Sequence, residues 1–468
     1  MRTTRTLLER RRISRALSVS LPCALVVASF ACAGGLASCA SDDHDVLLGE
    51  EELPDAAPDT SEAPDTSTEA GVLDAAPSPR DAATSDAAPR PVECTSEPCA
   101  TSLVTTLGTS VNGGFCALLE DGTVACWGQG TSAQLGRGAS VALADSPTPE
   151  RVVGLTDIVY VNHTCAIDKD GSTWCWGLGA FLQSTTATTT RAPTPVKLPI
   201  PPARMVSVRA TTASDVAVGC AVVDTGIICW GMNSYGQVGP PEVGARATYP
   251  VRDVPLPAGT TAASLEGLFV GNASFVLRED GTALSWGASP PLGRISSLFP
   301  DPYPRPVLLS GVTSIDVSND NACATASGIA YCWGSPPLTL TSIADPLERA
   351  LPEPVPTPEP VVQIATTSAG GNTTVPQRGC AVGVSGDVYC WGNNANGQAG
   401  DGTKDWAFTP VKVKGLPAPA SQVKTTPRST CALLTTGKIY CWGDNANGQL
   451  GNGVIRTPSV VPQEVLLP

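Results

Sequence analysis

The stretch GKIYCWGDNANGQLGNG, residues 437–453, has a near copy about fifty residues upstream, GDVYCWGNNANGQAGDG at 386–402. Both copies contain the dipeptide Trp-Gly. This dipeptide recurs at intervals of 47 to 58 residues along the chain, at Trp127, Trp176, Trp230, Trp286, Trp333, Trp391 and Trp442. A repeat of this length indicates a fold assembled from similar units, so we expect these tryptophans to be structural rather than catalytic.

Each Trp-Gly ends a phrase of two short apolar runs around a glycine, such as CALLEDGTVACWG at 116–128. This pattern predicts a β-hairpin in every repeat, and no segment has a helical period. A second phrase, proline followed by an apolar run as in TPVKVKGL at 409–416, predicts a further strand ahead of each hairpin. We therefore predict an all-β fold, a single seven-bladed β-propeller of four-stranded antiparallel blades.

The order of the two phrases predicts how the ring closes. The hairpin at 116–126 has no proline-containing strand ahead of it, and the chain ends with such a strand and no hairpin after it. We expect the C-terminal strand near Val465 to complete the first blade and to close the propeller.

Most of the 17 cysteines flank the predicted hairpins. A three-residue turn ending in Gly122 places Cys116 opposite Cys126, at a distance that a disulfide accepts. The fourth repeat has Phe275 and Ser285 instead, as expected if the two cysteines function as a pair. The alternatives are reduced core thiols and a zinc site, but the spacing lacks the close cysteine pairs of zinc sites. The predicted disulfides are Cys116–Cys126, Cys165–Cys175, Cys220–Cys229, Cys323–Cys332, Cys380–Cys390 and Cys431–Cys441, with a local bridge between Cys94 and Cys99.

The N-terminus has the layout of an export signal. Arginines precede an apolar run that ends in LASC, residues 36–39, which resembles a bacterial lipobox. We predict a lipoprotein signal peptide at 1–39 and lipidation of Cys39; the alternative is an ordinary secretory signal cut near Ala33 or Ala40. The protein would then be exported and membrane-anchored, at the periplasmic face or the cell surface.

The next segment, residues 40–93, carries fifteen acidic residues against two arginines and no aromatic residue. Such a composition predicts a disordered acidic tether rich in proline and alanine, followed by the propeller at 94–468. Nothing after Cys39 approaches eighteen consecutive apolar residues, so no transmembrane helix is expected. The chain also lacks a basic patch with interleaved aromatics, so we expect no nucleic acid partner.

The repeat phrase CALLTTGKIYCWGDNANGQLGNG at 431–453 resembles the regulator of chromosome condensation repeat, with its glycine turn, its Trp-Gly strand and its Gly-Gln-Leu-Gly loop. The resemblance covers residues 100–468 and implies a seven-bladed propeller. The founding member of that family is a nuclear exchange factor for a small GTPase. The resemblance therefore implies guanine-nucleotide exchange as one alternative function. A second family that is similar in architecture and localisation is the secreted propeller-type β-lactamase inhibitor protein.

Catalytic chemistry finds little support in the sequence. After Cys39 the chain has two histidines, His44 in the tether and His163 at a predicted strand end, and we expect His163 to be structural. The aspartates at the hairpin tips, Asp121, Asp170 and Asp280, resemble the Asp-box of sialidase propellers, but turn chemistry explains them better. We predict no catalytic residue, no cofactor and no metal, with an Asp-box glycan-active enzyme as the remaining enzymatic alternative.

The sequence thus favours a monomeric, non-enzymatic scaffold that binds a protein or a glycan through loops between its strands. Specificity is expected in the long irregular insertions, because loops on a rigid scaffold carry function. These insertions are residues 137–148, 178–192, 335–357 and 365–379.

Overall fold

The computed structural model describes residues 88–95, 97–106, 113–179, 191–210, 217–240, 248–318, 321–334, 350–367 and 378–468. All of them belong to one compact unit, residues 77–468. The signal peptide, the lipidation candidate Cys39 and the tether up to residue 87 lie outside the described residues. They remain predictions.

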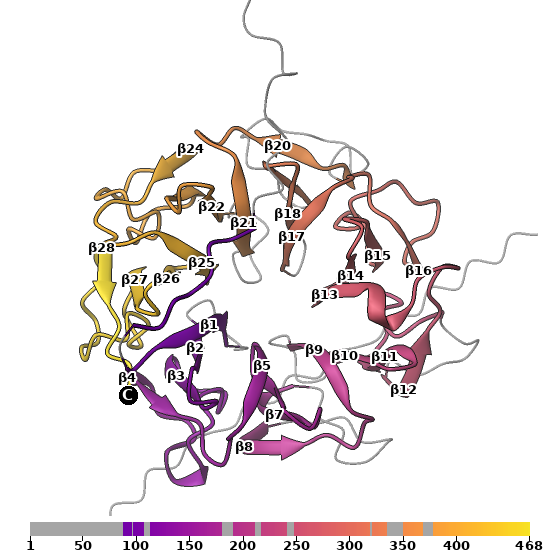
Figure 1. The fold of residues 1–468 in the computed structure, drawn as a ribbon, viewed down its shortest axis with the longest axis horizontal. Coiled ribbons are helices and arrows are strands. Elements are labelled where there is room, and N and C mark those ends of the chain that lie inside the picture. Colours follow the sequence, from indigo (N-terminus) through magenta and orange to yellow (C-terminus); the bar gives the residue numbers. More distant parts are fainter. Residues whose placement is uncertain are drawn as a thin grey trace, which may run out of the picture. The chain divides into compact units, whose positions relative to one another are not determined.

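Seven four-stranded sheets form the propeller, and each sheet uses four consecutive strands (Figure 1). Blade 1 contains β1 (Ala100–Thr105), β2 (Gly114–Leu119), β3 (Val124–Gly128) and β4 (Ser146–Arg151); blade 2 contains β5 (Ile158–Asn162), β6 (Cys165–Asp168), β7 (Thr173–Leu178) and β8 (Arg191–Lys197). Blade 3 contains β9 (Ala203–Ala210), β10 (Ala217–Val223), β11 (Gly226–Met232) and β12 (Thr248–Val254); blade 4 contains β13 (Leu265–Val270), β14 (Ala273–Arg278), β15 (Ala283–Gly287) and β16 (Asp301–Pro306). Blade 5 contains β17 (Val312–Val317), β18 (Asn321–Ala326), β19 (Ile329–Gly334) and β20 (Glu353–Val355); blade 6 contains β21 (Val361–Thr367), β22 (Arg378–Gly383), β23 (Val388–Gly392) and β24 (Ala407–Lys412). Blade 7 contains β25 (Ala420–Thr425), β26 (Ser429–Leu434), β27 (Ile439–Gly443) and β28 (Ser459–Glu464).

All strand pairings within the blades are antiparallel, and the first strand of each blade lies nearest the centre of the ring in Figure 1. Among the described residues, the short 3-10 helices η1 (Ala139–Val141) and η2 (Ala262–Ser264) lie in loops. The fold class predicted from the Trp-Gly period is therefore confirmed.

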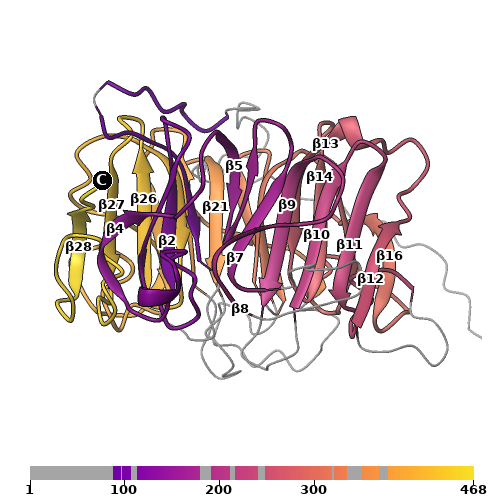
Figure 2. The ribbon, with the colours of Figure 1, turned by 90° about the horizontal axis from the view of Figure 1, so that it is seen from below.

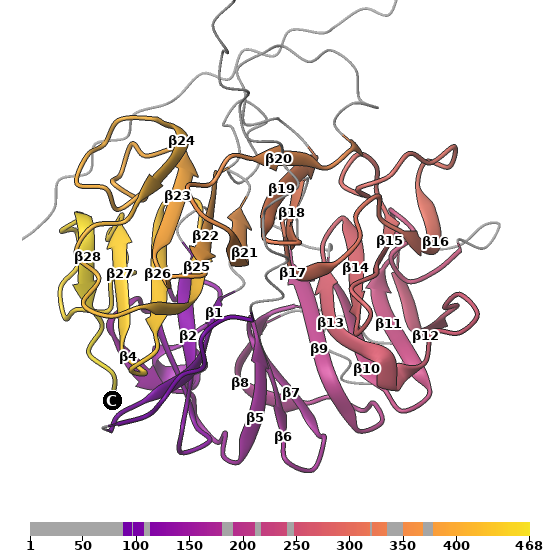
Figure 3. The same cartoon turned by 45° about the horizontal axis from the view of Figure 1, so that its top comes forward.

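The predicted place of the C-terminal strand was wrong. The strand β28 pairs with β27 and is the outer strand of blade 7, as Figure 3 shows, rather than a part of blade 1. Each proline-containing segment forms the fourth strand of the blade whose hairpin comes just before it in the sequence. Blade 1 needs no strand from the C-terminus, because β1 already covers the inner edge of its hairpin.

The ring closes by packing two complete blades against each other. One buried cluster joins Phe115 and Trp127 of blade 1 to Leu433 and Ile439 of blade 7, with Val465 beside them. The backbone N–H of Ala100 donates to the Gly437 carbonyl at 2.9 Å, which ties the start of β1 to the hairpin of blade 7. The closure is therefore non-covalent and mainly apolar.

The blade hairpins have the register that the cysteine spacing predicts. In six blades the two cysteines lie directly opposite each other and form a disulfide, with Cα–Cα distances of 4.0–4.1 Å. In blade 4, Phe275 lies opposite Ser285 at the same place. The seventh disulfide joins Cys94 to Cys99 ahead of β1.

Candidate binding face

The order of the strands divides the connections of the propeller into two sets. Turns between the second and third strands, and the connections from one blade to the next, emerge at one end of the blades, which we call the turn face. The first-to-second loops (inner loops) and the third-to-fourth loops (outer loops) emerge at the other end, because successive strands run in opposite directions. The outer loops thus leave the scaffold opposite to the hairpin turns.

The four insertions expected to carry specificity all belong to the inner and outer loops. Three are outer loops, of blades 1, 2 and 5, and the fourth, residues 365–379, is the inner loop of blade 6. Residues 180–190, 335–349 and 368–377 of these insertions lie outside the described residues. The topology therefore places all the predicted specificity loops at the same end of the blades.

The repeated Gly-Gln segment of the outer loops, which reads Gly-Gln-Ala-Gly at 397–400 in blade 6, is a structural bracket between blades. The indole Nε1 of Trp442 donates to the Gln398 carbonyl of the preceding blade at 3.0 Å, and both side chains are buried. The Gln398 side chain accepts the N–H of Asn396, and the Asn394 side chain accepts the N–H of Ala399. The motif that identifies the repeat thus serves packing, which leaves the rest of each outer loop for binding.

Exposed apolar side chains concentrate on the outer loops. Of fifteen exposed large apolar side chains among the described residues, eight lie there, although the outer loops are only a small part of the chain. Phe408 is also exposed and lies just after an outer loop, at the start of β24. Its ring packs against that of Trp406 with 6.2 Å between ring centroids. The eight are Val141, Leu143, Tyr235, Ile295, Leu298, Phe299, Val454 and Ile455.

Blade 4 contains a buried ionic network that the sequence did not reveal. Arg294, in the middle of its outer loop, and Asp301, at the start of β16, form an ion pair at 2.8 Å with both side chains buried. Arg294 also donates to the hydroxyl and the carbonyl of Ser285, the residue that replaces a cysteine. The paired loss of cysteines in this repeat was the only signal that pointed here.

The turn face holds the aspartates considered for catalysis. Burial acts to raise the pKa of Asp121, but hydrogen bonds from Thr123 and Arg151 outweigh it and hold that pKa below its ordinary value. Asp280 accepts the N–H of Thr282 at 2.9 Å. In blade 2 the corresponding N–H groups are accepted by Asp168 rather than by Asp170, which lies at the tip. Asp121, Asp168 and Asp280 sit on three different blades, and each shapes its own turn.

His163 lies between the inner strands of blades 1 and 2. Its Nδ1 is 3.0 Å from the Thr105 carbonyl oxygen and 3.2 Å from the Thr105 hydroxyl. Burial lowers the pKa of His163, so the ring is neutral near pH 7 and Nδ1–H can donate to the Thr105 carbonyl. The arrangement fits the structural role expected from the sequence.

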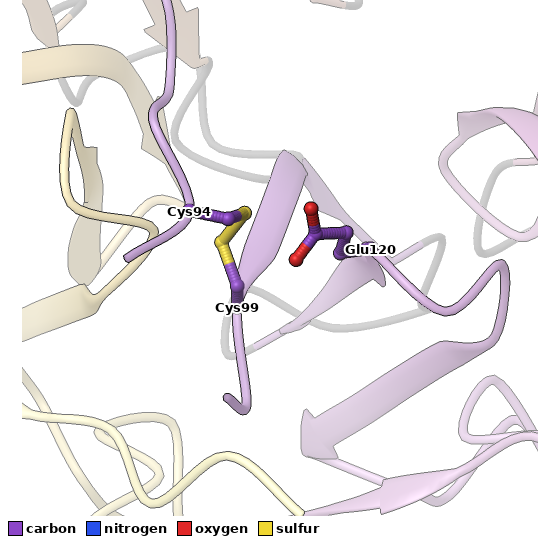
Figure 4. Close-up of side chains that lie close together, drawn as sticks. All are labelled: Cys94, Cys99 and Glu120. Carbon is purple, nitrogen blue, oxygen red and sulfur yellow. A yellow bond between two sulfur atoms is a disulfide. The ribbon is translucent and has the colours of Figure 1, made fainter. Parts of the chain in front are cut away.

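A group of three potential metal-ligand side chains comes together within the described part of the chain: Cys94, Cys99 and Glu120 (Figure 4). The two cysteines are joined by a disulfide, so neither offers a thiolate to a metal. The disulfide lies where the N-terminal segment crosses the turn face. Glu93 N–H donates to the Thr435 carbonyl there, and the segment appears as the indigo trace across the upper side of Figure 2.

A small hollow of about 110 Å³ opens at the turn face beside blade 2, between Asp157, Lys169 and the half-buried Trp174. Three of its charged groups, Asp157, Asp168 and Lys169, are already engaged. Lys169 pairs with Asp157 at 3.1 Å, and the indole Nε1 of Trp174 donates to Asp168 at 2.9 Å. The hollow therefore offers less to a ligand than the outer loops do.

The fold and the repeat define the class of the protein. It is a seven-bladed β-propeller in which tryptophans of one blade donate hydrogen bonds to the outer loop of the preceding blade. Two family models described as "Regulator of chromosome condensation (RCC1) repeat" match it, one over residues 421–449 and the other over 385–433 and 436–468. The chain thus carries regulator of chromosome condensation repeats. The matches begin within blade 6 and continue through blade 7, where the resemblance of the sequence is strongest.

Curated proteins match over limited stretches. The ultraviolet-B receptor UVR8 of Arabidopsis thaliana is 35% identical over 105 residues, which is 22% of this chain and 22% of that protein. The E3 ubiquitin-protein ligase HERC2 of Homo sapiens is 26% identical over 192 residues, 39% of this chain but only 4% of the ligase. The chain therefore spans well under two thirds of these relatives, and the alignments transfer no activity.

Solved structures agree on the fold. Yeast RCC1 (Prp20), in a crystal structure bound to Kap60, superposes with a TM-score of 0.58 at 18% identity and covers 85% of this chain and 91% of its own. Human WBSCR16 superposes with a TM-score of 0.55 at 19% identity, over 74% of this chain and 94% of its own. At these identities the likeness concerns the fold alone.

Proposed function

We propose that this protein is an exported, lipid-anchored propeller that acts as a non-enzymatic scaffold and binds a protein partner through its outer loops. The concentration of exposed apolar side chains on these loops carries the proposal. Exposed apolar surface on a soluble domain marks an interaction site, since burying it in a partner is favourable by about 25 cal/mol per Å². The rest of the described scaffold is stapled and bracketed, so binding requires little ordering.

Export is supported by the seven disulfides, because such bonds persist in oxidising compartments. Among the described residues, no helix combines the length and the hydropathy that crossing a membrane requires. The proposal that a lipid on Cys39 attaches the protein to the membrane rests on the lipobox-like LASC sequence at 36–39.

A protein partner is favoured over a glycan. Glycan recognition requires several free hydrogen-bonding side chains around an aromatic platform. In the described outer loops many polar side chains are used inside the loop, as Asn394, Gln398 and Asp401 are in blade 6. Nucleotide exchange has less support still. A solved structure of Saccharomyces cerevisiae Prp20p is described with its binding to Gsp1p and histones, but at 20% identity it shows the fold alone.

The proposal is tested by comparing matched surface variants of the full-length protein in its native envelope. Val454→Asp with Ile455→Asp alters the outer loop of blade 7, whereas Ile329→Asp alters a comparably exposed apolar residue at the turn face. After chemical cross-linking, we expect the outer-loop variant to lose protein adducts that the wild type and Ile329→Asp retain. Equal adducts in all three, or adducts released by free sugars, would contradict it.

A further inference from the structure

The outer loop of blade 4 is built differently from the others that the structure describes. Its hairpin carries Phe275 and Ser285 where the other six blades carry a disulfide, and Phe275 packs edge-on against Trp333 of blade 5 with 6.0 Å between ring centroids. The Ser285 hydroxyl donates to the Leu292 carbonyl at 2.6 Å and accepts from Arg294 Nε at 3.2 Å. Replacing the cysteine thus provides polar groups that hold the loop.

The buried pair of Arg294 and Asp301 fixes the two ends of the exposed part of this loop. The side chains are only 6% and 1% exposed and pair at 2.8 Å. Arg294 Nη2 also donates to the carbonyls of Ser285 and Tyr303, and Asp301 Oδ1 accepts the Tyr303 N–H. A buried ion pair is tolerated only when its remaining donors and acceptors are paired in this way. The loop ends are therefore held in one geometry.

Between these two residues the loop presents apolar side chains to solvent. Ile295 is 58% exposed, Leu298 40% and Phe299 78%. Ser296, between them, donates to Asp301 Oδ2 at 2.7 Å and accepts the Leu298 N–H at 3.1 Å, so the interior of the loop is also held. Tyr303 of blade 4 and Tyr235 of the neighbouring blade 3 are exposed as well. The two blades are close here, because the Gly236 backbone of blade 3 lies against Pro302 of blade 4.

The outer loop of blade 6 uses the corresponding residues in polar contacts. In blade 6, Asn394 donates to Asp401, and Asp401 accepts from the backbone and the hydroxyl of Thr403. In blade 4, by contrast, the loop is held by a buried ion pair, whose desolvation is unfavourable. One aromatic side chain, Phe299, and two aliphatic ones, Ile295 and Leu298, remain exposed to solvent. A rigid loop with an exposed aromatic centre has the properties of an interface hot spot, which loses little conformational entropy on binding.

We propose that residues 295–299 of blade 4 are the anchor that inserts into an apolar pocket of the protein partner. This inference rests on the proposed function and deepens it. The charge of the loop favours a protein as the occupant over a nucleic acid or an anionic lipid headgroup. Its only charged side chains are the internally paired Arg294 and Asp301, so it offers no cation to the phosphates of nucleic acids or to anionic lipid headgroups.

The test uses the full-length protein in its native envelope with a photo-cross-linking benzoylphenylalanine in place of Phe299. The matched position is Ile329, an exposed apolar residue at the turn face. Purified wild-type protein, Phe299→Ser and Ser296→Ala serve as competitors. Phe299 is largely exposed and Ser296 is half-buried, so the competitors are expected to fold, which their melting temperatures verify.

We expect a discrete protein adduct from position 299 that is absent from position 329. Wild-type competitor should suppress it, Phe299→Ser should need at least about ten times more protein, and Ser296→Ala a few times more at an unchanged melting temperature. Lipid adducts alone, or equal suppression by wild type and Phe299→Ser, would overturn the anchor. If the blade 7 variant of the previous section still loses its adducts while position 299 gives none, the outer loops bind but the anchor is wrong. If the blade 7 variant keeps its adducts and position 299 gives none, both proposals fail.

Discussion

The indole Nε1 of Trp127 donates a hydrogen bond to the Gln449 carbonyl at 3.0 Å, although the two residues are 322 positions apart in the sequence. The same bond joins neighbouring blades elsewhere. Trp176 donates to Gln134 at 2.9 Å and Trp286 donates to Gln237 at 2.8 Å. The seam between the last and first blades is thus built like any other blade junction. The ring needs no strand exchanged between its ends, because the repeat supplies the contact.

The hydrogen bond between Trp127 and Gln449, which joins blades 1 and 7, is expected to stabilise the fold as much as the equivalent bond between two other neighbouring blades. Trp127→Phe removes the hydrogen bond to the buried Gln449 carbonyl and part of a fully buried side chain. The expected loss in the free energy of unfolding is about 2–4 kcal/mol. Trp176→Phe, which breaks the equivalent bond to the Gln134 carbonyl and also alters a fully buried side chain, is the matched control. Denaturant midpoints should fall equally. A fall for Trp176→Phe alone would show that the seam is already open.

Local features of this fold could be predicted from the sequence, and the assignment of strands to blades could not. The spacing of Cys116 and Cys126 fixes a hairpin and its register because only nearby residues are involved. Whether a proline strand such as β24 belongs to the blade before or after it depends on contacts between distant segments. The inner strand β1 has neither proline nor tryptophan to mark it. We therefore expected β28 to fill a place that β1 already occupies.

The contacts that hold the outer loop of blade 4 could not be predicted from the sequence for a similar reason. The joint loss of two cysteines was visible, but nothing in the sequence links Ser285 to Arg294 and Asp301. These residues meet only when the outer loop folds back over its own hairpin. By contrast, the turn role of Asp121 and Asp280 depends on residues two positions away and could be predicted.

The contact between Gly437 and the N-terminal segment gives a second prediction. Gly437 has φ of 78°, and a Cβ added there would lie 2.2 Å from Cys99 Sγ. Gly415 has φ of 88° with nothing near its Cβ position, so it serves as the control for backbone strain alone. Gly415→Ala should cost about 1–2 kcal/mol. Gly437→Ala should cost more and should release the segment that Arg90 attaches to the Val384 carbonyl, at 3.3 Å.

Limited digestion with a glutamate-specific protease measures that release, because the exposed Glu93 lies in the same segment and its N–H donates to the Thr435 carbonyl. Cleavage after Glu93 should be faster in Gly437→Ala than in Gly415→Ala at equal distance from the melting temperature. Equal cleavage rates in the two variants would mean that the disulfide-bonded segment is not held by this contact.

Lipidation of Cys39 gives a third prediction. Cys39→Ser should move the protein from the membrane fraction to a soluble exported fraction and should abolish incorporation of radiolabelled palmitate. Cys32→Ser, seven residues earlier in the predicted signal peptide, should change neither. Label retained by Cys39→Ser would mean that the lipid is attached elsewhere, whereas a wild type that incorporates no label would point to an ordinary secretory signal.

The buried pair of blade 4 predicts an acid-sensitive contribution to stability. Burial acts to raise the pKa of Asp301, but hydrogen bonds from Arg294 and Ser296 outweigh it and lower that pKa below its ordinary value. A carboxyl whose pKa is lower in the folded state contributes stability that is complete above its unfolded pKa of about 3.9. This contribution is lost as the pH falls from there through the lower, folded pKa.

Two variants separate the pair from the other carboxylates that titrate in the same range. Asp301→Asn leaves Arg294 buried without a counter-ion and should cost about 3–5 kcal/mol at pH 7. Arg294→Met with Asp301→Leu replaces both charges by apolar groups, so it should cost much less and should flatten the melting-temperature profile below about pH 4 relative to the wild type. Parallel profiles for the wild type and the double variant would contradict the assignment. They would mean that acid sensitivity arises elsewhere, for example at Asp121, whose pKa is also lowered.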